Sequence, residues 1–591
     1  MWQAGRVSPP SATYGTGFNR ETALQRLGDE HFDVLVVGGG ITGAGVALDA
    51  ASRGLRTALV EARDFASGTS SKSSKMVHGG IRYLQQRDFR LVYEALHERQ
   101  RLLENAPHLV TPLPFLIPLF GSRGVVQKSV ARAYSTALWT YDITGGIRIG
   151  KRHRRISKEE ALAHVPNLRA ERLVSAFLYF DARTDDARLT LAVARTAALH
   201  HGAVVANYVP VVSFVEDSRG KVCGAHIRDA GPLAEKTARP RSPEIEVRAS
   251  VVVNATGVWT DELSALEEPS RPHTIRPAKG VHITVPRTRV PVDIAAVVPV
   301  KSDKRSIFIV PWPDGENVYL GTTDTDWDGS LEDPVCLPED VDYLIDAANA
   351  LLTKPIDRED VTGVWAGLRP LLAPSQGRHM SERTADLSRR HKVDVSAHGV
   401  VTVTGGKLTT YRKMAEDTVD AAIPLLDQAT ARRAGRCRTK RLPIIGAEGT
   451  ADLLRSASHE QYGIDRKCFE MIVARHGGET PSVLAMTEGR PELLEPLVPG
   501  LPELKVEAIW GVREEMALTV DDLLSRRVRA VLRRAEDTAS AALGVSALVA
   551  PLWNHEPIEV ADEASRFAAS ARRDLATAGL QQKVNQRERP Q

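Results

Sequence analysis

The sequence has little cysteine, and the thiols that it has are scattered. Cys223, Cys336, Cys437 and Cys468 occur in 591 residues without any Cys-x-x-Cys pair. This spacing argues against a disulfide scaffold and against a zinc site with closely spaced ligands. Sparse thiols are typical of a reducing compartment, so the sequence predicts a cytoplasmic protein without a metal site.

Long apolar runs and a dominant charge are also missing. No stretch reaches 18 consecutive apolar residues, which argues against a transmembrane helix. The 77 basic and 74 acidic side chains give a net charge of +3, so no overall electric field would recruit nucleic acid. With 42% apolar and 26% charged residues, the composition is that of a folded globular protein.

The two ends of the sequence lack the periodicity of folded elements. Residues 1–28 contain two prolines and no apolar core like that of a secretory signal, and they predict a disordered leader. Residues 575–591 are mostly polar and predict a frayed tail. Nearly all of the remaining chain is therefore expected to fold.

A glycine-rich turn follows the first apolar strand pattern. Gly38, Gly40 and Gly43 form a G-x-G-x-x-G that opens a small-residue helix, and the next strand pattern ends in Glu61. In this β-α-β setting the glycines let the backbone approach a pyrophosphate at the helix N-terminus. The carboxylate of Glu61 would bind ribose hydroxyls and repel a 2′-phosphate, which disfavours NADP.

Two further glycine turns, distant in sequence, favour FAD over NAD. Residues 254–257 end an apolar strand pattern, and residues 405–410 precede a helix pattern. Backbone amides at such turns can face a flavin ring or a pyrophosphate. A cofactor site built from three distant parts of the chain suits FAD, whereas a simple NAD enzyme usually has a compact cofactor half.

Residues 107–120 are apolar but contain four prolines. Proline interrupts helices and is confined to the edges of sheets, so neither a helix nor a central strand is expected here. A buried extended connection is favoured over an exposed surface that touches a membrane.

Two basic clusters allow two interpretations. A solvated face is favoured for each, and attraction to anionic lipid, worth about 1 kcal/mol per charge, is the alternative. The clusters are Arg148, Lys151, Arg152, Arg154 and Arg155, and Arg526, Arg527, Arg529, Arg533 and Arg534.

Several motifs together resemble one flavoenzyme family. The most specific are TSSKSSKMVHGGIRYL at 69–84 and GGKLTTYRKMAE at 405–416, and DDARL, NATGVW, KGVHITVP, GTTD, GLRPLL and WGVREEMALTVDDLLSRRVR accompany them. The sequence resembles the FAD-dependent glycerol-3-phosphate dehydrogenases of the aerobic, quinone-linked type from about residue 31 to 550.

The resemblance implies an α/β fold. A Rossmann-like FAD-binding domain of the amine-oxidase-like flavoprotein class would be interleaved with a mixed-β substrate domain, and a C-terminal α-helical domain would follow. The oxidoreductase region is expected at 29–430 and the helical domain at 442–555. Within that region, the FAD domain is expected from about 29–87, 180–265 and 395–430, and the substrate domain from about 88–179 and 266–394.

The resemblance also implies a reaction. It is the oxidation of sn-glycerol 3-phosphate to dihydroxyacetone phosphate by hydride transfer to FAD, in glycerol and glycerophospholipid metabolism. The electrons would pass to a membrane quinone, so the protein would contact the inner face of an anionic membrane peripherally. An oxidase that uses oxygen is the alternative enzyme, and a flavin-bound regulatory protein is the alternative of another class. A homodimer is left open.

Oxidation of a secondary alcohol requires a base for the hydroxyl proton and cations for the phosphate. The resemblance implies a substrate pocket lined by Arg82, Tyr83, His282, Arg369 and Lys407. His282 is favoured as the base, with Arg369 near the reacting oxygen. Arg82 and Lys407 are candidates for phosphate or flavin charge.

The expected cofactor residues come from the three glycine turns and from the serine-rich loop after Glu61. The pair Asp185 and Asp186 is expected to cap the helix that follows and is given no part in catalysis. The cofactor residues are Gly38, Gly39, Gly40, Thr42, Gly43, Glu61, Thr69, Ser70, Ser71, Ser74, Lys75, His78, Gly79, Gly80, Ala255, Thr256, Gly257, Gly405, Gly406, Lys407, Leu408 and Thr409.

Overall fold

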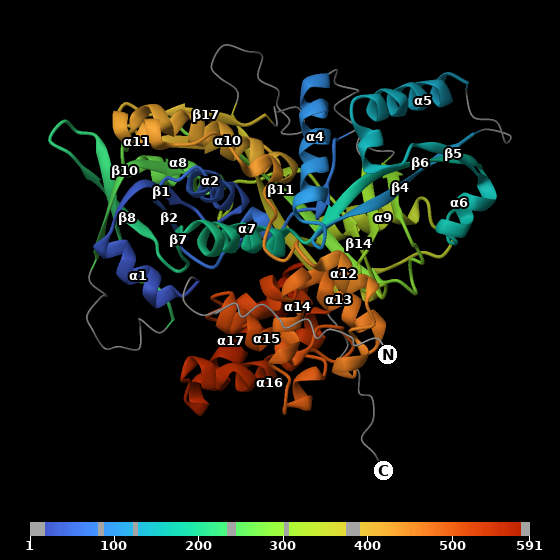
Figure 1. Cartoon of the computed structure of the whole chain (residues 1–591). Helices are drawn as coiled ribbons and strands as arrows, with labels where there is room; N and C mark the ends of the chain where they lie inside the picture. Colours follow the sequence, from blue (N-terminus) through green and yellow to red (C-terminus); the bar gives the residue numbers. More distant parts are fainter. Residues whose placement is uncertain are drawn as a thin grey trace, which may run out of the picture.

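Two β-sheets lie side by side, and a helical domain packs beneath both of them (Figure 1). The computed structural model describes residues 18–80, 88–121, 128–232, 244–300, 306–373 and 390–580. The chain passes repeatedly between the two sheets before it enters the helical domain, which is coloured orange to red in Figure 1. The expected fold class is confirmed, with its interleaved α/β region and its helical C-terminal part.

The first sheet forms around the glycine turn. Its strands are β1 (His31–Val37), β2 (Thr57–Val60), β7 (Val204–Ala206), β8 (Val211–Glu216), β9 (Val222–Ile227), β10 (Ile245–Asn254), β17 (Lys392–Val395) and β18 (Val401–Thr404). The order is β17-β18-β10-β1-β2-β7, and β9 and β8 extend from β10. The strands from β18 to β7 are parallel, so their carboxyl ends meet at one edge of the sheet.

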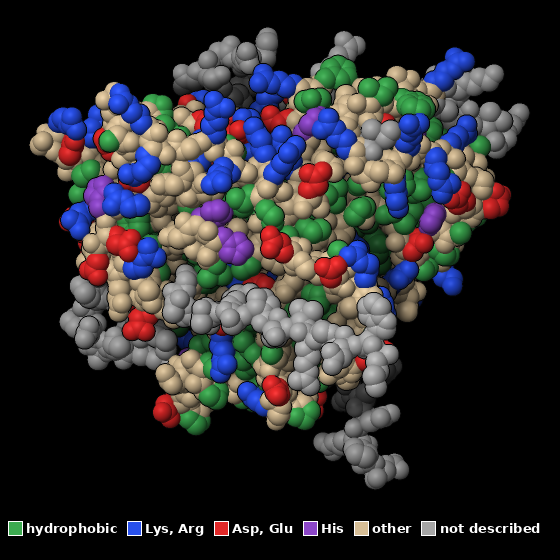
Figure 2. All heavy atoms as spheres, viewed as in Figure 1, with side chains coloured by type: hydrophobic (Ala, Val, Ile, Leu, Met, Phe, Trp, Pro, Cys, Tyr) green, Lys and Arg blue, Asp and Glu red, His purple; other side chains and the backbone are tan. Residues whose placement is uncertain are grey.

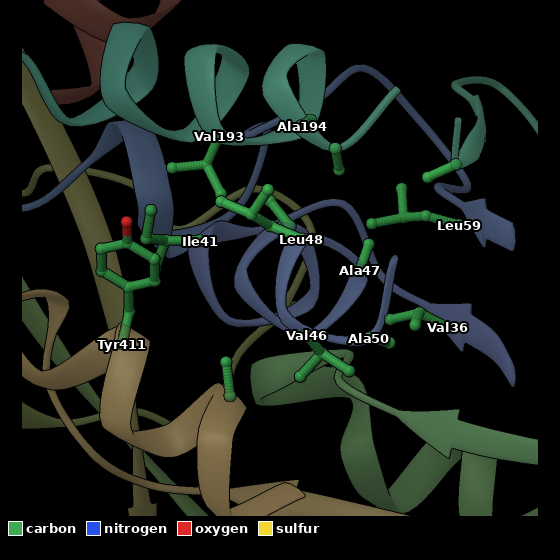
Figure 3. Packing of buried hydrophobic residues seen from close by; sticks show 14 of the residues in the cluster. Val36, Ile41, Val46, Ala47, Leu48, Ala50, Leu59, Val193, Ala194 and Tyr411 are labelled. Atoms are coloured by element: carbon green, nitrogen blue, oxygen red, sulfur yellow. The ribbon is translucent and has the colours of Figure 1, made fainter. Parts of the chain in front are cut away.

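The helix that follows the glycine turn is buried on all sides. This helix, α2 (Ile41–Ser52), packs against α7 (Asp186–His201) and α10 (Tyr411–Ala422) as well as the sheet (Figure 3). Small residues allow the close approach, because a Cβ at Gly45 would lie 2.8 Å from the ring of Tyr411. A helix that is apolar on every side belongs in a protein interior.

The second sheet is mixed and carries the other wall of the site. Its strands are β3 (Met76–Val77), β4 (Val110–Phe120), β5 (Arg154–Ser157), β6 (Leu173–Thr184), β11 (Ile275–Pro286), β12 (Ala295–Pro299), β13 (Ser306–Pro311), β14 (Asn317–Gly321), β15 (Thr325–Asp326) and β16 (Gly363–Leu372). The order is β15-β11-β14-β13-β12-β4-β6-β3, with β16 beside β11 and β5 beside β6. Only the β4–β12 pair is parallel within the described part of this sheet.

The proline-rich stretch is a central strand, so the expectation of a non-strand connection at 107–120 is wrong. β4 pairs with β6 along its whole length and with β12 at Phe115 and Leu116. Pro112, Pro114 and Pro118 are an even number of residues apart, so their missing N–H groups face the same edge of the strand. The donors of the alternate residues remain available for the long pairing with β6.

Part of the expected leader is also folded. Residues 20–29 form α1 (Arg20–Asp29), whose first turn is capped where Asn19 Oδ1 accepts from the Thr22 amide at 3.0 Å. Leu27 is fully buried against the first sheet. The expectation of a disordered leader is therefore wrong from residue 18 on, and its first 17 residues lie outside the described residues.

The remaining helices of the two-sheet body lie around the second sheet and at the ends of the first. They are α4 (Phe89–Asn105), α5 (Lys128–Ile143), α6 (Lys158–His164), α8 (Thr260–Ala265) and α9 (Pro338–Asn349). No helix in the described ranges is both long and apolar enough to cross a membrane.

The C-terminal domain has its own apolar core and extends past its expected end. Its helices, with α11 leading into it, are α11 (Gln428–Arg433), α12 (Thr450–Arg455), α13 (Arg466–His476), α14 (Thr480–Ala485), α15 (Lys505–Glu514), α16 (Ala535–Trp553) and α17 (Pro557–Thr577). α17 packs along α16 and buries Phe567 beside Trp553. The domain thus continues beyond residue 555, and residues 575–580 are ordered rather than frayed.

The second basic cluster is buried, so the expectation of a solvated or lipid-binding face is wrong there. It lies on η12 (Asp522–Arg527), η13 (Ala530–Leu532) and the residues that flank them. Arg527, Arg529 and Arg533 are 2 to 4% exposed and pair with Asp64, Asp186 and Asp314 of the two-sheet body. Of this cluster, Arg534 has the most accessible side chain, at 37%.

Candidate active site

A cavity of about 930 Å³ lies between the two sheets. The carboxyl ends of β1, β2, β10 and β18 contribute one wall, and β11, β16 and the segment after β14 contribute the other. The edge where parallel strands end is the usual place for a ligand in an α/β sheet. The volume is within the range of cofactor and substrate sites.

The glycine turn forms the dinucleotide end of this cavity. Gly38 has φ +112° and turns the chain from β1 into α2. A Cβ at Gly43 would lie 1.8 Å from the carbonyl oxygen of Gly38, so any larger residue there would displace the helix. Gly40, at the N-cap position of α2, supplies no side-chain acceptor, and the positive end of the helix lies at the cavity, where it favours an anion.

Glu61 is held by the backbone at the end of β2. One of its carboxylate oxygens accepts from the Gly39 amide at 2.6 Å, and the other accepts from the Arg63 amide at 2.9 Å. Burial raises the pKa of Glu61, and these two amides oppose that effect. The carboxylate lines the cavity and retains lone pairs for ribose hydroxyls.

The serine-rich loop, which includes η1 (Thr69–Ser71), lies beside the glycine turn. Ser70 Oγ accepts from the Ile41 amide at 2.9 Å, and Thr69 donates to the Leu368 carbonyl at 2.6 Å. The loop therefore joins α2 to β16. Lys75 does not line the cavity, so this side chain is not placed as the cofactor cation that the sequence suggested.

Most of the expected cofactor residues line the same cavity. Those that do not are Gly39, Gly43, Ser71, Lys75 and Gly79. Those that do are Gly38, Gly40, Thr42, Glu61, Thr69, Ser70, Ser74, His78, Gly80, Ala255, Thr256, Gly257, Gly405, Gly406, Lys407, Leu408 and Thr409.

The residues present fit a dinucleotide with a further ring system. A helix N-terminus with glycine at its N-cap position, a carboxylate at the end of the neighbouring strand and glycine turns at 254–257 and 405–410 share one cavity. The cavity then continues past this end to His282 and Arg369 on the second sheet. A nicotinamide or flavin ring bound at that junction would lie beside these two side chains.

His282 lies on β11 and is enclosed by aromatic residues of β16 and β14. Its ring stacks on Trp365 with 4.7 Å between centroids and 6° between planes, and Tyr319 lies edge-on at 6.3 Å. Nε2 is 2.8 Å from Ser74 Oγ, and Nδ1 is buried without a hydrogen-bond partner in the described part of the chain. Burial, then the charges of Lys75 and Arg369, lower the pKa of His282, so the ring is neutral at pH 7.

Arg369 is oriented by acceptors on three sides. It donates to Asp324 Oδ1 at 3.1 Å, to Thr322 Oγ1 at 3.1 Å and to the Lys279 carbonyl at 3.2 Å. Its side chain is 20% exposed and lines the cavity. Lys407, at the turn before η6 (Leu408–Thr410), lines the same cavity.

Two expected substrate residues cannot be placed. Arg82 and Tyr83 lie outside the described residues. The structure brings together the other three, His282, Arg369 and Lys407.

Sequence reasoning missed the aromatic and apolar walls. Trp365 and Tyr319 around His282 stand in strand patterns without any polar signal, and Asp324 belongs to a GTTD motif that was matched without a role. An apolar wall extends the cavity toward α5; its residues are Ile117, Tyr134, Ala137, Tyr179, Val297 and Phe308. Their alternation along strands is the same as that of ordinary core residues.

Two family models match successive parts of the chain. Residues 33–412 match the family described as FAD dependent oxidoreductase. Residues 437–559 match the C-terminal domain of alpha-glycerophosphate oxidase. Together the two matches span the two-sheet body and most of the helical domain.

Individual relatives cover nearly the whole chain. It is 41% identical to glycerol-3-phosphate dehydrogenase 2 of Mycobacterium tuberculosis over 95% of this chain and 91% of that protein. It is 37% identical to the human mitochondrial glycerol-3-phosphate dehydrogenase over 86% of this chain and 69% of that protein. The solved structure of the Bacillus halodurans glycerol-3-phosphate dehydrogenase with FAD has a TM-score of 0.73 and 32% identity, covering 94% of this chain and 97% of that one.

Proposed function

The chain belongs to the family of FAD-dependent glycerol-3-phosphate dehydrogenases, and from that premise we propose that it oxidises sn-glycerol 3-phosphate to dihydroxyacetone phosphate. The observation that carries the proposal is the continuity of the cavity. Its dinucleotide end meets a buried neutral histidine and two cationic side chains at the junction of the sheets. When bound, FAD supplies the acceptor for the hydride of the substrate.

His282 is proposed to take the proton of the substrate hydroxyl. A neutral imidazole can accept a proton, and the lowered pKa keeps it in that form. The dianion of the substrate phosphate would raise the pKa of His282 when it binds nearby, because negative charge favours the imidazolium. Stacking on Trp365 and the contact with Ser74 fix the ring for this transfer.

Arg369 and Lys407 are proposed to hold negative charge at the other side of the substrate. Arg369 is fixed by Asp324 and Thr322, so little side-chain entropy is lost when an oxygen binds to it. Lys407 lies at the glycine turn and adds a second cation to the cavity. Positive charge there also stabilises the reduced flavin, which is anionic.

Anaerobic addition of substrate to the purified yellow protein tests the proposal. We expect sn-glycerol 3-phosphate to bleach the flavin absorbance, while glycerol and inorganic phosphate leave it unchanged. Glycerol is the matched control, because it keeps the reacting alcohol and lacks the phosphate. Bleaching by glycerol alone, or none by sn-glycerol 3-phosphate, contradicts the proposed substrate.

Replacement of the base sharpens the same test. His282→Asn should slow flavin reduction by roughly a hundredfold, the scale of a positioned general base, at near-normal FAD content. His164→Asn is the control, because His164 pairs with Asp293 at the surface and does not line the cavity. Reduction of the His282→Asn protein at the wild-type rate from pH 6 to 9 would remove this residue from the role.

A membrane quinone is proposed as the electron acceptor. The apolar wall of the cavity supports this assignment, because it leads from the site toward α5 between Tyr134, Tyr179 and Phe308. A substituted quinone ring is a flat apolar ligand that suits such a wall. Steady-state assays with a soluble quinone analogue should show faster turnover than assays with oxygen.

Membrane contact is proposed through exposed apolar side chains of α4 and α5, together with the first basic cluster, whose residues are exposed. Phe89 and Tyr93 of α4 and Trp139 and Ile143 of α5 are 49 to 78% exposed, and we call them the α4/α5 face. Figure 2 shows green hydrophobic side chains over these helices, with blue Lys and Arg side chains beside them. Aromatic, aliphatic and basic side chains together are typical of an interfacial surface.

The oxidase alternative is kept because of one comparison. The helical domain matches a family that is described after an alpha-glycerophosphate oxidase. The rate of flavin reoxidation distinguishes the two, since an oxidase should reoxidise with oxygen at least as fast as with a quinone analogue. A quinone preference supports the dehydrogenase.

A further inference from the structure

A buried ion-pair node joins the helical domain to the loop of the active site. Arg529 donates from Nη2 to Asp186 Oδ1 at 2.8 Å and to the Ser71 carbonyl. Lys75 Nζ contacts the same two groups, 3.3 Å from Asp186 Oδ1 and 3.2 Å from the carbonyl oxygen. Arg529, Asp186 and Lys75, which we call the Arg529 node, are at most 3% exposed.

The sequence assigned Asp186 to a helix cap, and the structure gives it a second role. The side chain of Asp185 caps α7 by accepting from the Arg188 amide at 3.1 Å. Asp186 accepts from the Ala187 amide of the same helix at 3.0 Å, and also from the Ser73 amide at 3.0 Å and the Ser73 hydroxyl at 2.7 Å. The carboxylate thus fixes the backbone immediately before Ser74.

Ser74 carries the connection to the proposed base. Its hydroxyl is 2.8 Å from His282 Nε2, and its carbonyl accepts from the Tyr319 hydroxyl at 3.0 Å. Trp365 donates to the Ser73 carbonyl at 3.3 Å and stacks on His282. An unbroken series of contacts therefore runs from Arg529 to the imidazole.

Backbone strain marks the same residues. Arg529 has φ +62° and Lys75 has φ +55°, although neither is glycine. Such left-handed conformations persist where surrounding contacts over-determine them, and they concentrate at functional sites. The surrounding contacts thus hold Arg529 and Lys75, the two cations of the node, in unfavourable backbone conformations.

We propose that Arg529 is a positioning residue for the oxidation, acting through Asp186 and Ser73 on the placement of Ser74 and His282. The inference rests on the proposed function. It assigns the helical domain an indirect part in the reaction, since the loop at 71–75 is held from that domain. Arg529 touches neither the cavity nor His282, so its effect passes through the loop.

The node has an electrostatic signature. Burial and then the charge of Arg529 lower the pKa of Lys75 to about 8, while Asp186 and Asp185 raise it. Beyond these, the groups that face Lys75 are His282 of β11 and the indole rings of Trp312 and Trp365. Loss of the Lys75 proton removes one of two cations from Asp186, so flavin reduction should slow as pH rises past about 8.

We call the fall in the rate of flavin reduction above about pH 8 the alkaline limb. Two substitutions should move this limb in opposite directions. Arg529→Gln removes a charge that lowers the pKa of Lys75, so the limb should move to higher pH. Asp186→Asn removes a charge that raises that pKa, so the limb should move to lower pH. A general loss of packing would not separate the two variants by sign.

Stopped-flow flavin reduction by sn-glycerol 3-phosphate, measured from pH 6 to 10 on the FAD-loaded protein, tests the proposal. We expect Arg529→Gln to slow reduction roughly tenfold or more, because small displacements of catalytic groups have effects of this size. Arg529→Lys keeps the charge and should keep the limb near pH 8 with a smaller loss of rate. Arg534→Gln is the matched control, since Arg534 is a surface arginine of the same segment.

The outcomes separate the two proposals. If sn-glycerol 3-phosphate reduces the flavin of the wild type, and Arg529→Gln is reduced at the same rate, the positioning role is overturned and the proposed function is not. Equal losses in Arg529→Gln and Asp186→Asn without opposite shifts of the limb also overturn the positioning role, because they indicate a purely structural defect. No reduction of the wild type overturns the proposed function and this inference together. FAD absorbance and thermal unfolding establish whether each variant is folded. If Arg529→Gln does not fold, Arg529→Lys replaces it in the test, and wild-type kinetics of Arg529→Lys overturn the positioning role.

Discussion

Two arginine-rich segments of similar composition differ in solvent exposure in this protein. The surface cluster, Arg148, Lys151, Arg152, Arg154 and Arg155, is exposed throughout. The interdomain cluster, Arg526, Arg527, Arg529 and Arg533, is buried between the helical domain and the two-sheet body. Charge density along a sequence therefore does not indicate whether the charges meet water or carboxylates.

The difference arises from partners that are distant in the chain. The carboxylates that neutralise the interdomain cluster include Asp64, Asp186 and Asp314, which precede it by more than 200 residues. Buried charges require such pairing, because an unpaired ion in an apolar interior is strongly destabilising. The surface cluster pairs locally, since Arg154 binds Glu160 of the helix that follows, α6.

Removal of one buried carboxylate should have the largest effect. Asp64 is fully buried, accepts from Arg527 at 2.7 and 2.9 Å, and also binds Arg526. Asp64→Ala leaves both guanidinium groups without this partner, and we expect a loss of about 3–5 kcal/mol in apparent unfolding free energy. Denaturant unfolding of the FAD-loaded protein measures the loss.

The matched change in the surface cluster should be nearly silent. Arg154→Ala removes a half-exposed ion pair, and such pairs contribute about 0.2–1 kcal/mol. Equal losses for Asp64→Ala and Arg154→Ala would contradict the distinction between the two clusters.

Local patterns in the sequence predicted local structure well. The glycine turn needed only Gly38, Gly43 and Glu61 in their order, since the physics of a β-α-β phosphate site is contained in about 30 residues. The proline-rich strand was missed because the rule against proline in central strands does not consider which edge of the strand the prolines face. Pro112, Pro114 and Pro118 are an even number of residues apart and face one edge, so the N–H groups of the alternate residues remain available for pairing with β6.

The active site was predictable in part. His282 and Arg369 could be proposed from motifs, and they do share the cavity with the glycine turns. The surroundings of His282 could not be predicted, because Ser74 lies 208 residues away in sequence and Trp365 stands in an ordinary strand pattern. The pairing of Lys75 with Asp186, away from the cavity lining, could not be predicted either, since Asp186 was expected only to cap a helix.

Acid should destabilise the interface that holds the interdomain cluster. Burial alone would raise the pKa of Glu515, but Arg188 and Arg195 lower it to about 2. Because the folded pKa lies below the unfolded value near 4.3, the stabilisation is complete above that pH and is lost as pH falls toward 2. The Glu515 contribution is about 3 kcal/mol, so unfolding temperatures measured from pH 5 to 3 should fall steeply.

Two variants isolate the contribution of Glu515. Glu515→Gln should have a shallower dependence on pH between 5 and 3, although it is less stable at neutral pH. Glu160→Gln, which alters a carboxylate of the surface cluster's own ion pair, should keep the wild-type slope because water screens that pair. Parallel slopes for wild type and Glu515→Gln would show that acid acts elsewhere.

Membrane binding should depend on the surface cluster and not on the interdomain cluster. Lys151→Gln combined with Arg152→Gln should weaken co-sedimentation with anionic vesicles by about 2 kcal/mol at low salt, since each basic residue near the surface contributes about 1 kcal/mol. Arg534→Gln is the control, because Arg534 is a partly exposed arginine of the other segment. If Arg534→Gln weakens binding as much as the double change, the proposed membrane face is wrong.

The smaller of the two expected effects on membrane binding concerns the apolar α4/α5 face. Ile143 is 78% exposed on α5, and its burial in the lipid interface would contribute about 1 kcal/mol, part of the value for full burial of an isoleucine. Ile143→Ser should therefore weaken vesicle binding roughly fivefold. Unlike the charge changes, this loss should persist at 1 M salt, where the Debye length is about 3 Å and charge attraction is screened. A loss that disappears at high salt would mean that Ile143 does not enter the lipid and that electrostatic attraction alone holds the protein there.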